Sequence, residues 1–400
     1  IMNITDLDDK TILGSEKQDM ELGTFTEAYI NSFKKDLNVL DIKSAEKYPR
    51  ASEHVDDMVL LTERLVKKGY AYEKLKSIYF DISRYKEYGN LSGIDLNKIH
   101  LGATVDLDDY EKDNPRDFTL LKRSRLSELK RGIFIKTQWG NVRPSWHLQC
   151  AAMSMKYLGE TFDIHAAGRE LVFPHHENEI AIAGALSGKP LARYWVHCDR
   201  VLVDGKKVDE KGQALTIRSL LDQGWSGRVL RYWLLSNHYR KTLQYSEDRL
   251  KEAQRALRRL DTCIEALLGV KSDSANHELD QLLYDIRNGF VDAMDDDLNI
   301  SAALASIFHN IKTINKLIAE NKLNSEGAKQ ILTAFEKINS VLKIFKFEQA
   351  KYDQATQKLL DERENARRQE NWTLADKLRQ KLLERGIMVR DATITPSDSK

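Results

Sequence analysis

The sequence contains few cysteines, no long hydrophobic run and almost no net charge. No apolar stretch approaches the roughly 18 residues that span a bilayer, so we expect a chain that contacts no membrane. Only Cys150, Cys198 and Cys263 carry thiols, which is too few for a disulfide framework and is typical of the reducing cytosol. These absences predict a cytoplasmic globular protein whose 400 residues form two or more domains.

The charge balance excludes one route to nucleic acids. The 62 basic and 61 acidic residues leave a net charge of +1, so the chain has no global positive field. Any contact with nucleic acid must therefore come from local basic stretches.

Two hydrophobic patterns divide the chain. Residues 1–250 alternate short apolar runs with helical patterns, which predicts an α/β domain with a mostly parallel sheet, and IMNIT (1–5) is typical of a buried strand. From about residue 251 to 350, apolar residues recur at i, i+3, i+4 and i+7, which predicts an all-α helical bundle. The charged stretch 351–400 predicts one or two further helices and a short strand over 386–395.

The stretch FPHHENE (173–179) raises the question of a metal site. A helix that begins near Pro174 places His175 and Glu179 on one face, one turn apart, while His176 points elsewhere. With Cys150, in RPSWHLQC, these side chains form a set that suits Zn²⁺ better than Mg²⁺ or Ca²⁺. Alternatively, His175 is a capping or core histidine and Cys150 a small buried hydrophobe. A zinc protease is excluded, since the second histidine of H-E-x-x-H is missing.

The chain resembles cysteinyl-tRNA synthetases, which are class I aminoacyl-tRNA synthetases, over nearly its whole length. The pair SWHLQC and FPHHENE, at a fixed separation, is the most specific part of the resemblance. The other matching stretches occur in the order of the family: NITDLDDK, PRASEHVDDM, KKGYAYE, YFDISRYKEYGNLSG, DFTLLK, GRELVFPHHENEIA, TIRSLL and RYWLLSNHYRK.

The resemblance implies an architecture and a reaction. Residues 1–205 would form an N-terminally incomplete Rossmann-like catalytic domain with a connective segment inserted at about 50–140, and 206–250 a phosphate-loop and stem-contact region. Residues 251–350 would be the tRNA-binding bundle and 351–400 the anticodon-side module. The implied substrates are L-cysteine, ATP with Mg²⁺ and tRNA(Cys), and the expected state is a monomer.

The resemblance also assigns site residues. The family's zinc ligands correspond to Cys150, His175 and Glu179, and positions that line its amino-acid pocket correspond to Thr5 and Trp146. Glu170 stands in a glycine-rich stretch of the family. Here that stretch reads HAAGREL (165–171), with alanines in place of two glycines, so the close backbone approach of the family is in question at this point.

Discrimination against serine gives the zinc a physical purpose. Cysteine and serine differ by one atom, and a shaped pocket separates such neighbours by only about 10–200-fold. Zn²⁺ favours a thiolate over a hydroxyl, so one ion per chain would select the substrate. The alternative is a purely structural zinc, although such sites usually consist of cysteines and histidines without a glutamate.

Class I synthetases stabilise the ATP phosphates with an H-x-G-H helix start and a K-M-S-K-S loop. KKVDEKGQAL (206–215) stands where the loop is expected, but Glu210 replaces a lysine if Lys207 is its first residue. Lys206, Lys207 or Lys211 would supply the charge. The competing interpretation is a solvated charged loop.

The segment ENARRQENWTLADKLRQKL (364–382) resembles the C-terminal module of the family. Trp372 would stack on a base, and Arg367, Arg368 and Arg379 would contact phosphates. Alternatively, Trp372 packs on a neighbouring helix of an amphipathic pair.

The first strand of the family, with its cysteine ligand, and its H-x-G-H motif have no counterpart in residues 1–400. We expect an upstream segment of roughly 60–80 residues to carry both, and residues 1–400 alone not to form cysteinyl-adenylate, because both parts complete one catalytic site.

Two other functions stay open at this stage. A related ligase passes activated cysteine to a small amine, as in the mycothiol pathway, and the helical and C-terminal segments argue against it. A non-catalytic or truncated paralogue would bind zinc or RNA without activating an amino acid.

Overall fold

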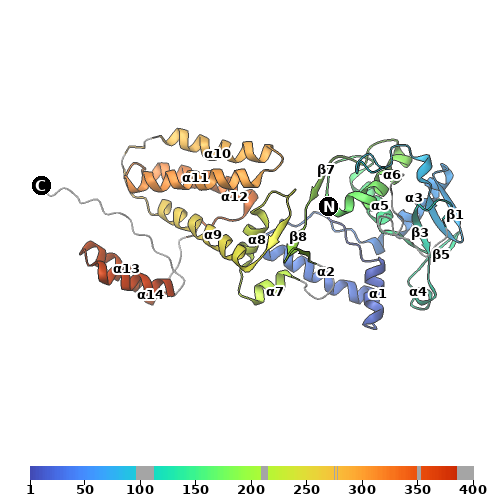
Figure 1. Cartoon of the computed structure of the whole chain (residues 1–400), viewed down its shortest axis with the longest axis horizontal. Helices are drawn as coiled ribbons and strands as arrows, with labels where there is room; N and C mark the ends of the chain where they lie inside the picture. The colour runs from blue at the N-terminus through green and yellow to red at the C-terminus, as the bar shows by residue number, and fades with distance from the viewer. Residues whose placement is uncertain (96–111, 209–214, 274, 277, 349–352, 385–400) are drawn as a thin grey trace. The chain divides into compact units, whose positions relative to one another are not determined.

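The computed structural model describes residues 1–95, 112–208, 215–273, 275–276, 278–348 and 353–384. The chain forms two compact units, which are described separately (Figure 1). Unit 1 comprises Ile1–Gly227 and Tyr239–Ser246, and unit 2 comprises Arg228–His238 and Glu247–Lys400.

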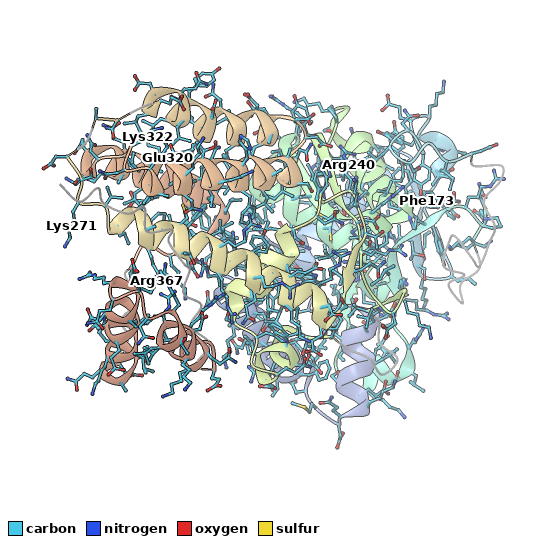
Figure 2. All side chains as sticks on the ribbon, turned by 60° about the vertical axis from the view of Figure 1, so that its left-hand side comes forward. Phe173, Arg240, Lys271, Glu320, Lys322 and Arg367 are labelled. Atoms are coloured by element: carbon cyan, nitrogen blue, oxygen red, sulfur yellow. The ribbon has the colours of Figure 1, made fainter. Side chains whose placement is uncertain are left out.

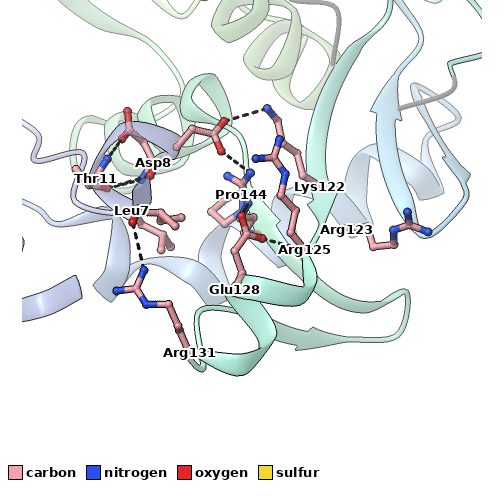
Figure 3. Close-up of polar contacts among 12 residues, drawn as sticks. Leu7, Asp8, Thr11, Lys122, Arg123, Arg125, Glu128, Arg131 and Pro144 are labelled. Carbon is pink, nitrogen blue, oxygen red and sulfur yellow. Dashed lines mark hydrogen bonds and ion pairs between the residues drawn. The ribbon is translucent and has the colours of Figure 1, made fainter. Parts of the chain in front are cut away.

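Unit 1 begins with an extended segment and two helices, α1 (Asp9–Lys17) and α2 (Leu22–Val39). The expected buried strand at IMNIT is wrong. Its backbone forms only an isolated parallel bridge between Ile4 and Arg50, and Ile1 is 44% exposed. The side chain of Asp8 caps α1 by accepting a hydrogen bond from the Thr11 amide at 2.9 Å (Figure 3).

The largest sheet of unit 1 is antiparallel throughout. Its strands follow the order β1-β2-β3-β5-β4, with bounds β1 (Ala71–Lys74), β2 (Ser77–Phe80), β3 (Phe118–Arg123), β4 (Ile135–Thr137) and β5 (Gly140–Pro144). The expectation of a mostly parallel sheet is therefore wrong here, because all five strands fall in or next to the segment predicted to be inserted, and antiparallel strands pair without the crossover helices that parallel strands need.

Parallel pairing occurs where strands alternate with helices. Strand β6 (Phe162–Gly168) pairs in parallel with β7 (Ala192–Cys198), and the connection between them contains α6 (Glu177–Ser187). Strand β8 (Val201–Val203) pairs in parallel with β10 (Leu243–Tyr245) and antiparallel with the short β9 (Lys206–Lys207). Other described elements of this unit are η1 (Ala51–Glu53), α3 (Val55–Lys67), η2 (Ile82–Arg84), α4 (Leu126–Lys130), η4 (Arg169–Leu171), η5 (Val172–His176) and α7 (Ile217–Asp222).

The core of unit 1 lies between the antiparallel sheet and helices α3, α5 (Trp146–Leu158) and α6. Small side chains line the contact of α5 with α6, where Ala151, Ala152 and Ala181 are at most 2% exposed. The two helix axes therefore approach closely (Figure 1). This packing fixes the two helices that carry the candidate metal ligands.

Buried charges attach the inserted segment to α1. Arg143 on β5 forms ion pairs with Asp9 of α1 and, at 2.9 Å, with Glu128 of α4. Glu128 also accepts the backbone N–H of Arg125 at 2.7 Å (Figure 3). Burial opposes the charged form of Asp9, but Arg143 and Lys122 outweigh it and lower the pKa of this carboxyl group. The insert is thus held to the start of α1 by ion pairs.

Unit 2 contains the predicted helical bundle. Helices α9 (Glu247–Leu268), α10 (Leu279–Asp295), α11 (Ile300–Ala319) and α12 (Ser325–Leu342) match the four periodic segments. Helix α8 (Gly227–Leu235) joins them through Arg228, which forms a bidentate pair with Asp261 at 2.9 and 2.6 Å. The bundle surface carries ordinary ion pairs such as Lys322 with Glu320 at 2.7 Å (Figure 2).

Two further helices, α13 (Gln354–Arg368) and α14 (Trp372–Glu384), form a hairpin in the described part of the C-terminal region. The strand expected at 386–395 lies outside the described residues. Within the described ranges, no helix is both long and apolar enough to cross a membrane.

Candidate metal centre

Three predicted ligands converge at one point of unit 1. Cys150 lies on α5, His175 in the turn η5 and Glu179 in the first turn of α6, and one donor atom from each lies within 4.8 Å of the others. His175 Nε2 is 2.7 Å from Glu179 Oε1. The structure therefore brings a thiol, an imidazole and a carboxylate together, as the sequence predicts.

The start of α6 lies close to the predicted one. Helix α6 is assigned from Glu177, and the turn η5 before it has helical dihedrals except at Phe173, whose backbone is extended with φ −133° and ψ 132°. The residue before a proline is restricted to this region. The Phe173–Pro174 peptide bond is cis. His175 nevertheless keeps its spacing of four residues from Glu179, so their side chains still meet.

The carboxylate of Glu179 has an oxygen that fits a metal ion. Glu179 is fully buried, and among the described residues its Oε1 receives no hydrogen bond of acceptable geometry although His175 Nε2 is so close. A buried oxygen without a hydrogen bond is rare in proteins. This oxygen, His175 Nε2 and the Cys150 thiol are placed like ligands of a single ion, and the S, N and O donors suit Zn²⁺.

The ionisation of the cluster is consistent with a cation site. Burial opposes the charged form of Glu179, but contacts from the imidazoles of His165 and His175 outweigh it and lower its pKa to about 2. Burial and the charge of Glu179 raise the pKa of the Cys150 thiol well above its usual range, against a hydrogen bond from the Asn3 amide at 3.4 Å. A cation in the cluster would favour the thiolate, so its binding would release a proton.

A second group of imidazoles lies next to the first. His165 Nε2 contacts Glu179 Oε2 at 3.0 Å, and His176 Nδ1 lies 2.9 Å from His197 Nε2. One ring nitrogen of His165, one of His176 and a carboxylate oxygen of Glu179 lie within 4.8 Å of one another and form a second set of possible ligands.

Sequence reasoning missed His165 and His197. They lie on β6 and β7, whose parallel register pairs His165 with Trp195 and Ala167 with His197. Because residues at i and i+2 share a face of a strand, both histidines lie on the same face of this sheet. The alternation in FDIHAA and YWVHC indicates which residues share a face of each strand. It does not indicate that the two strands pair, so the sequence could not bring the two histidines together.

The predicted substrate-pocket residues line two cavities that share Trp146 and His175. Thr5, Trp146 and Cys150 line a cavity of about 310 Å³. The Trp146 ring lies 4.5 Å from the His175 ring, between centroids, and is 43% exposed. Glu170 instead lines a neighbouring cavity of about 380 Å³, with Arg200 3.8 Å from its carboxylate. The structure therefore places Thr5 and Trp146 beside the cluster, and Glu170 in the second cavity.

The candidate phosphate-contacting lysines lie at the end of a hairpin. Lys206 and Lys207 form β9 and pair with β8, and a turn at Asp204 and Gly205 with φ of 49° and 73° joins the strands. The Lys206 side chain is exposed. Lys211 lies outside the described residues, so the structure does not place the whole loop.

The candidate tRNA-contacting residues lie on the α13–α14 hairpin. The guanidinium of Arg367 stands 5.6 Å over the Trp372 ring, with Arg367 7% and Trp372 51% exposed. Arg368 and Arg379 are exposed. One face of Trp372 thus packs on a cation while half of the side chain remains accessible.

Comparison with known proteins agrees with this arrangement. The model of the "tRNA synthetases class I (C) catalytic domain" matches residues 1–255. A DALR domain model matches 289–346, and the model of the "Cysteinyl-tRNA ligase anticodon binding domain" matches 350–393. The cysteine–tRNA ligase of Methanosarcina mazei is 38% identical over 100% of this chain and 86% of its own length. The chain belongs to the cysteinyl-tRNA synthetase family.

Other relatives support this membership. The cysteine–tRNA ligase of Chlamydia muridarum is 40% identical over 98% of this chain and 85% of its own length. A structure provisionally assigned as an arginyl-tRNA synthetase from Campylobacter jejuni has a TM-score of 0.54, with 14% identity over 82% of this chain and 69% of its own. That likeness shows the shared fold of class I synthetases. The predicted family and fold class are thus confirmed.

Proposed function

We propose that the protein activates L-cysteine with ATP and transfers it to tRNA(Cys). The observation that carries this proposal is the cluster of Cys150, His175 and Glu179 beside Trp146, in a chain of the cysteinyl-tRNA synthetase family. The relatives that match over the whole chain bear the name of this activity. The anticodon-binding family model at residues 350–393 supports a tRNA, in preference to a small amine, as acceptor.

The cluster supplies the amino-acid site. Cys150, His175 and Glu179 would hold one Zn²⁺, and the ion when bound would take the substrate sulfur as thiolate and prefer it to the hydroxyl of serine. Trp146 and Thr5 line the cavity beside the cluster and would exclude larger side chains. Trp146 also covers the His175 ring and limits its rotation. Selection at this site needs no editing domain, because it rests on the chemistry of sulfur.

The remaining roles follow from the positions of the basic residues. Lys206, Lys207 or Lys211 would neutralise the phosphates of ATP, which enters with Mg²⁺. Residues 251–350 would contact the tRNA, and Arg367, Arg368, Trp372 and Arg379 would contact it on the anticodon side. The proposal includes a monomer, and it places the protein in the cytoplasm because Cys150, Cys198 and Cys263 are free thiols.

The test is transfer of labelled cysteine by the full-length protein that contains these residues. We expect cysteine-dependent pyrophosphate exchange with ATP and attachment of cysteine to tRNA(Cys), but not to a tRNA of another amino acid. Exchange with transfer only to an amino sugar would point to the small-amine ligase. The absence of exchange, from a folded and zinc-loaded protein, would point to a non-catalytic paralogue.

A further inference from the structure

A buried carboxylate beside the metal ligands has no role in the scheme above. Glu177 lies between His175 and Glu179 in sequence and is 1% exposed. Since each helical residue turns by about 100°, Glu177 projects about 200° away from both of these side chains. It therefore points out of the metal cluster, towards the inserted segment.

Glu177 binds one loop of that segment with both oxygens. Its Oε2 accepts the backbone N–H of Gly89 at 2.9 Å, and its Oε1 accepts the N–H and hydroxyl of Ser92 at 2.7 and 2.8 Å. Gly89 has φ of 98°, a conformation that favours glycine, and this turn directs both amides to one carboxylate. Three short hydrogen bonds to a buried charge make a strong, directional contact.

The next residue extends the contact to α5. Asn178 Oδ1 accepts the hydroxyl of Tyr88 at 2.5 Å, and its Nδ2 lies 3.4 Å from His147 Nδ1. His147 Nε2 lies 2.7 Å from the carbonyl oxygen of Thr119, which can only accept, so Nε2 carries the proton and Nδ1 accepts from Asn178. Asn178 therefore joins the loop to the helix that carries Cys150.

Further residues of the loop at 85–92 and of the chain just after α3 contact the rest of α6. A Cβ atom at Gly184 would lie 2.1 Å from the Tyr85 hydroxyl, so Tyr85 packs directly on the helix backbone. At the end of α6, Lys68 donates to the carbonyl oxygens of Ala185 and Leu186 at 3.2 and 2.7 Å. Contacts along the whole length of α6 hold it against α3 and the loop at 85–92.

We propose that Glu177 is a positioning residue of the metal centre, which fixes the directions of His175 and Glu179 by holding the start of α6 on the loop at 88–92. This inference rests on the proposed function, since it takes the cluster to be the metal site. His175 and Glu179 flank Glu177 in sequence, and Glu177 is the first residue of α6, directly after the turn η5. The hydrogen bonds of Glu177 therefore fix the orientation of η5 relative to α6. Loss of these hydrogen bonds would allow the His175 imidazole and the Glu179 carboxylate to move apart.

The test compares two buried acids in the full-length protein. Glu177→Gln keeps the volume but places an amide N–H₂ group opposite backbone donors. Asp117→Asn is the matched control, because Asp117 is 1% exposed and accepts from the Ile82 amide at 3.1 Å and the Tyr72 hydroxyl at 2.8 Å in the same inserted sheet. Asp117 touches no ligand of the cluster, so its replacement disturbs the fold alone.

Zn²⁺ affinity is measured by competition with a chelator, and ligand geometry by the visible spectrum of the Co²⁺-loaded protein. We expect Glu177→Gln to lower the affinity about 10-fold, the lower end of the effect of residues that orient metal ligands, and to alter the Co²⁺ spectrum. Asp117→Asn should lower Tm comparably but leave both metal readouts unchanged. Ser92→Ala removes one of the three hydrogen bonds, so it should lower the affinity less than Glu177→Gln.

A Glu177→Gln variant with the Zn²⁺ affinity and Co²⁺ spectrum of the wild type would overturn the inference, whatever its Tm. Equal losses of affinity in Glu177→Gln and Asp117→Asn would overturn it too, since general destabilisation would then explain both. A wild-type protein that binds no Zn²⁺ would instead contradict the proposed function before any variant is compared.

Discussion

Replacing His175 by alanine should abolish zinc binding and lower cysteine-dependent pyrophosphate exchange by about 10³-fold in the full-length protein. The loss follows from the geometry, since Cys150, His175 and Glu179 each supply one donor atom within 4.8 Å of the others. A metal contact with the substrate worth about 4 kcal/mol corresponds to this factor. Elemental analysis and the exchange assay measure the two effects. Cys150→Ser should behave in the same way.

The neighbouring histidine provides the control. His176→Ala removes an imidazole next in sequence, but His176 Nδ1 is engaged with His197 at 2.9 Å and His176 does not belong to the ligand set that contains Cys150. This variant should keep the zinc content of the wild type. If His176→Ala loses zinc while His175→Ala keeps it, the ion is held by the set His165, His176 and Glu179, and our assignment of the ligands is wrong.

Replacing Lys207 by alanine should slow adenylate formation by roughly 10²–10³-fold and leave cysteine binding nearly intact, the range for removal of one preorganised donor. The hairpin of β8 and β9 positions the backbone of Lys207, and a cation there would act on charge that develops on the phosphates. Single-turnover formation of cysteinyl-adenylate measures the rate, and cysteine binding is measured separately. The same measurement on Lys206→Ala and Lys211→Ala shows which of the three lysines contacts the phosphates.

Lys189→Ala is the matched control for the loss of a positive charge. Lys189 is exposed and pairs with Glu160 at 2.8 Å on the surface, so its removal should leave the rate unchanged. Wild-type rates in all three loop variants would show that this loop does not stabilise the phosphates. A loss of cysteine binding that matches the loss of rate would assign Lys207 to the amino-acid site instead.

The sequence was most informative where one short-range rule decides the structure. The four bundle helices follow from apolar residues three and four apart, and the meeting of His175 with Glu179 follows from a spacing of one helical turn. Cys150, 25 residues from His175, could be suggested from its residue type, but only the resemblance to a family favoured it over a small buried hydrophobe. Helix α6 is assigned from Glu177, three residues after Pro174, because a π-helical turn, η5, precedes it, and the proline pattern does not predict that turn.

Features that depend on pairing between distant segments could not be predicted. The antiparallel order of β1–β5 requires strands that are up to about 40 residues apart in sequence to find one another, and an apolar run does not encode its partner. The same holds for His165 beside Glu179 and for Glu177 on the loop at 88–92. A buried glutamate in a helix is, from sequence alone, indistinguishable from an exposed one.

The central claim is that this cluster binds the sulfur of the substrate, and Co²⁺ substitution tests it most directly. The full-length protein is loaded with Co²⁺, and absorption is recorded as L-cysteine or L-serine is added. Our account predicts that cysteine strengthens the sulfur-to-cobalt charge-transfer band, because the thiolate of the substrate joins the thiolates that the protein supplies, and that serine leaves it unchanged. A Co²⁺ spectrum that does not respond to saturating cysteine would contradict the account and leave the ion a structural role.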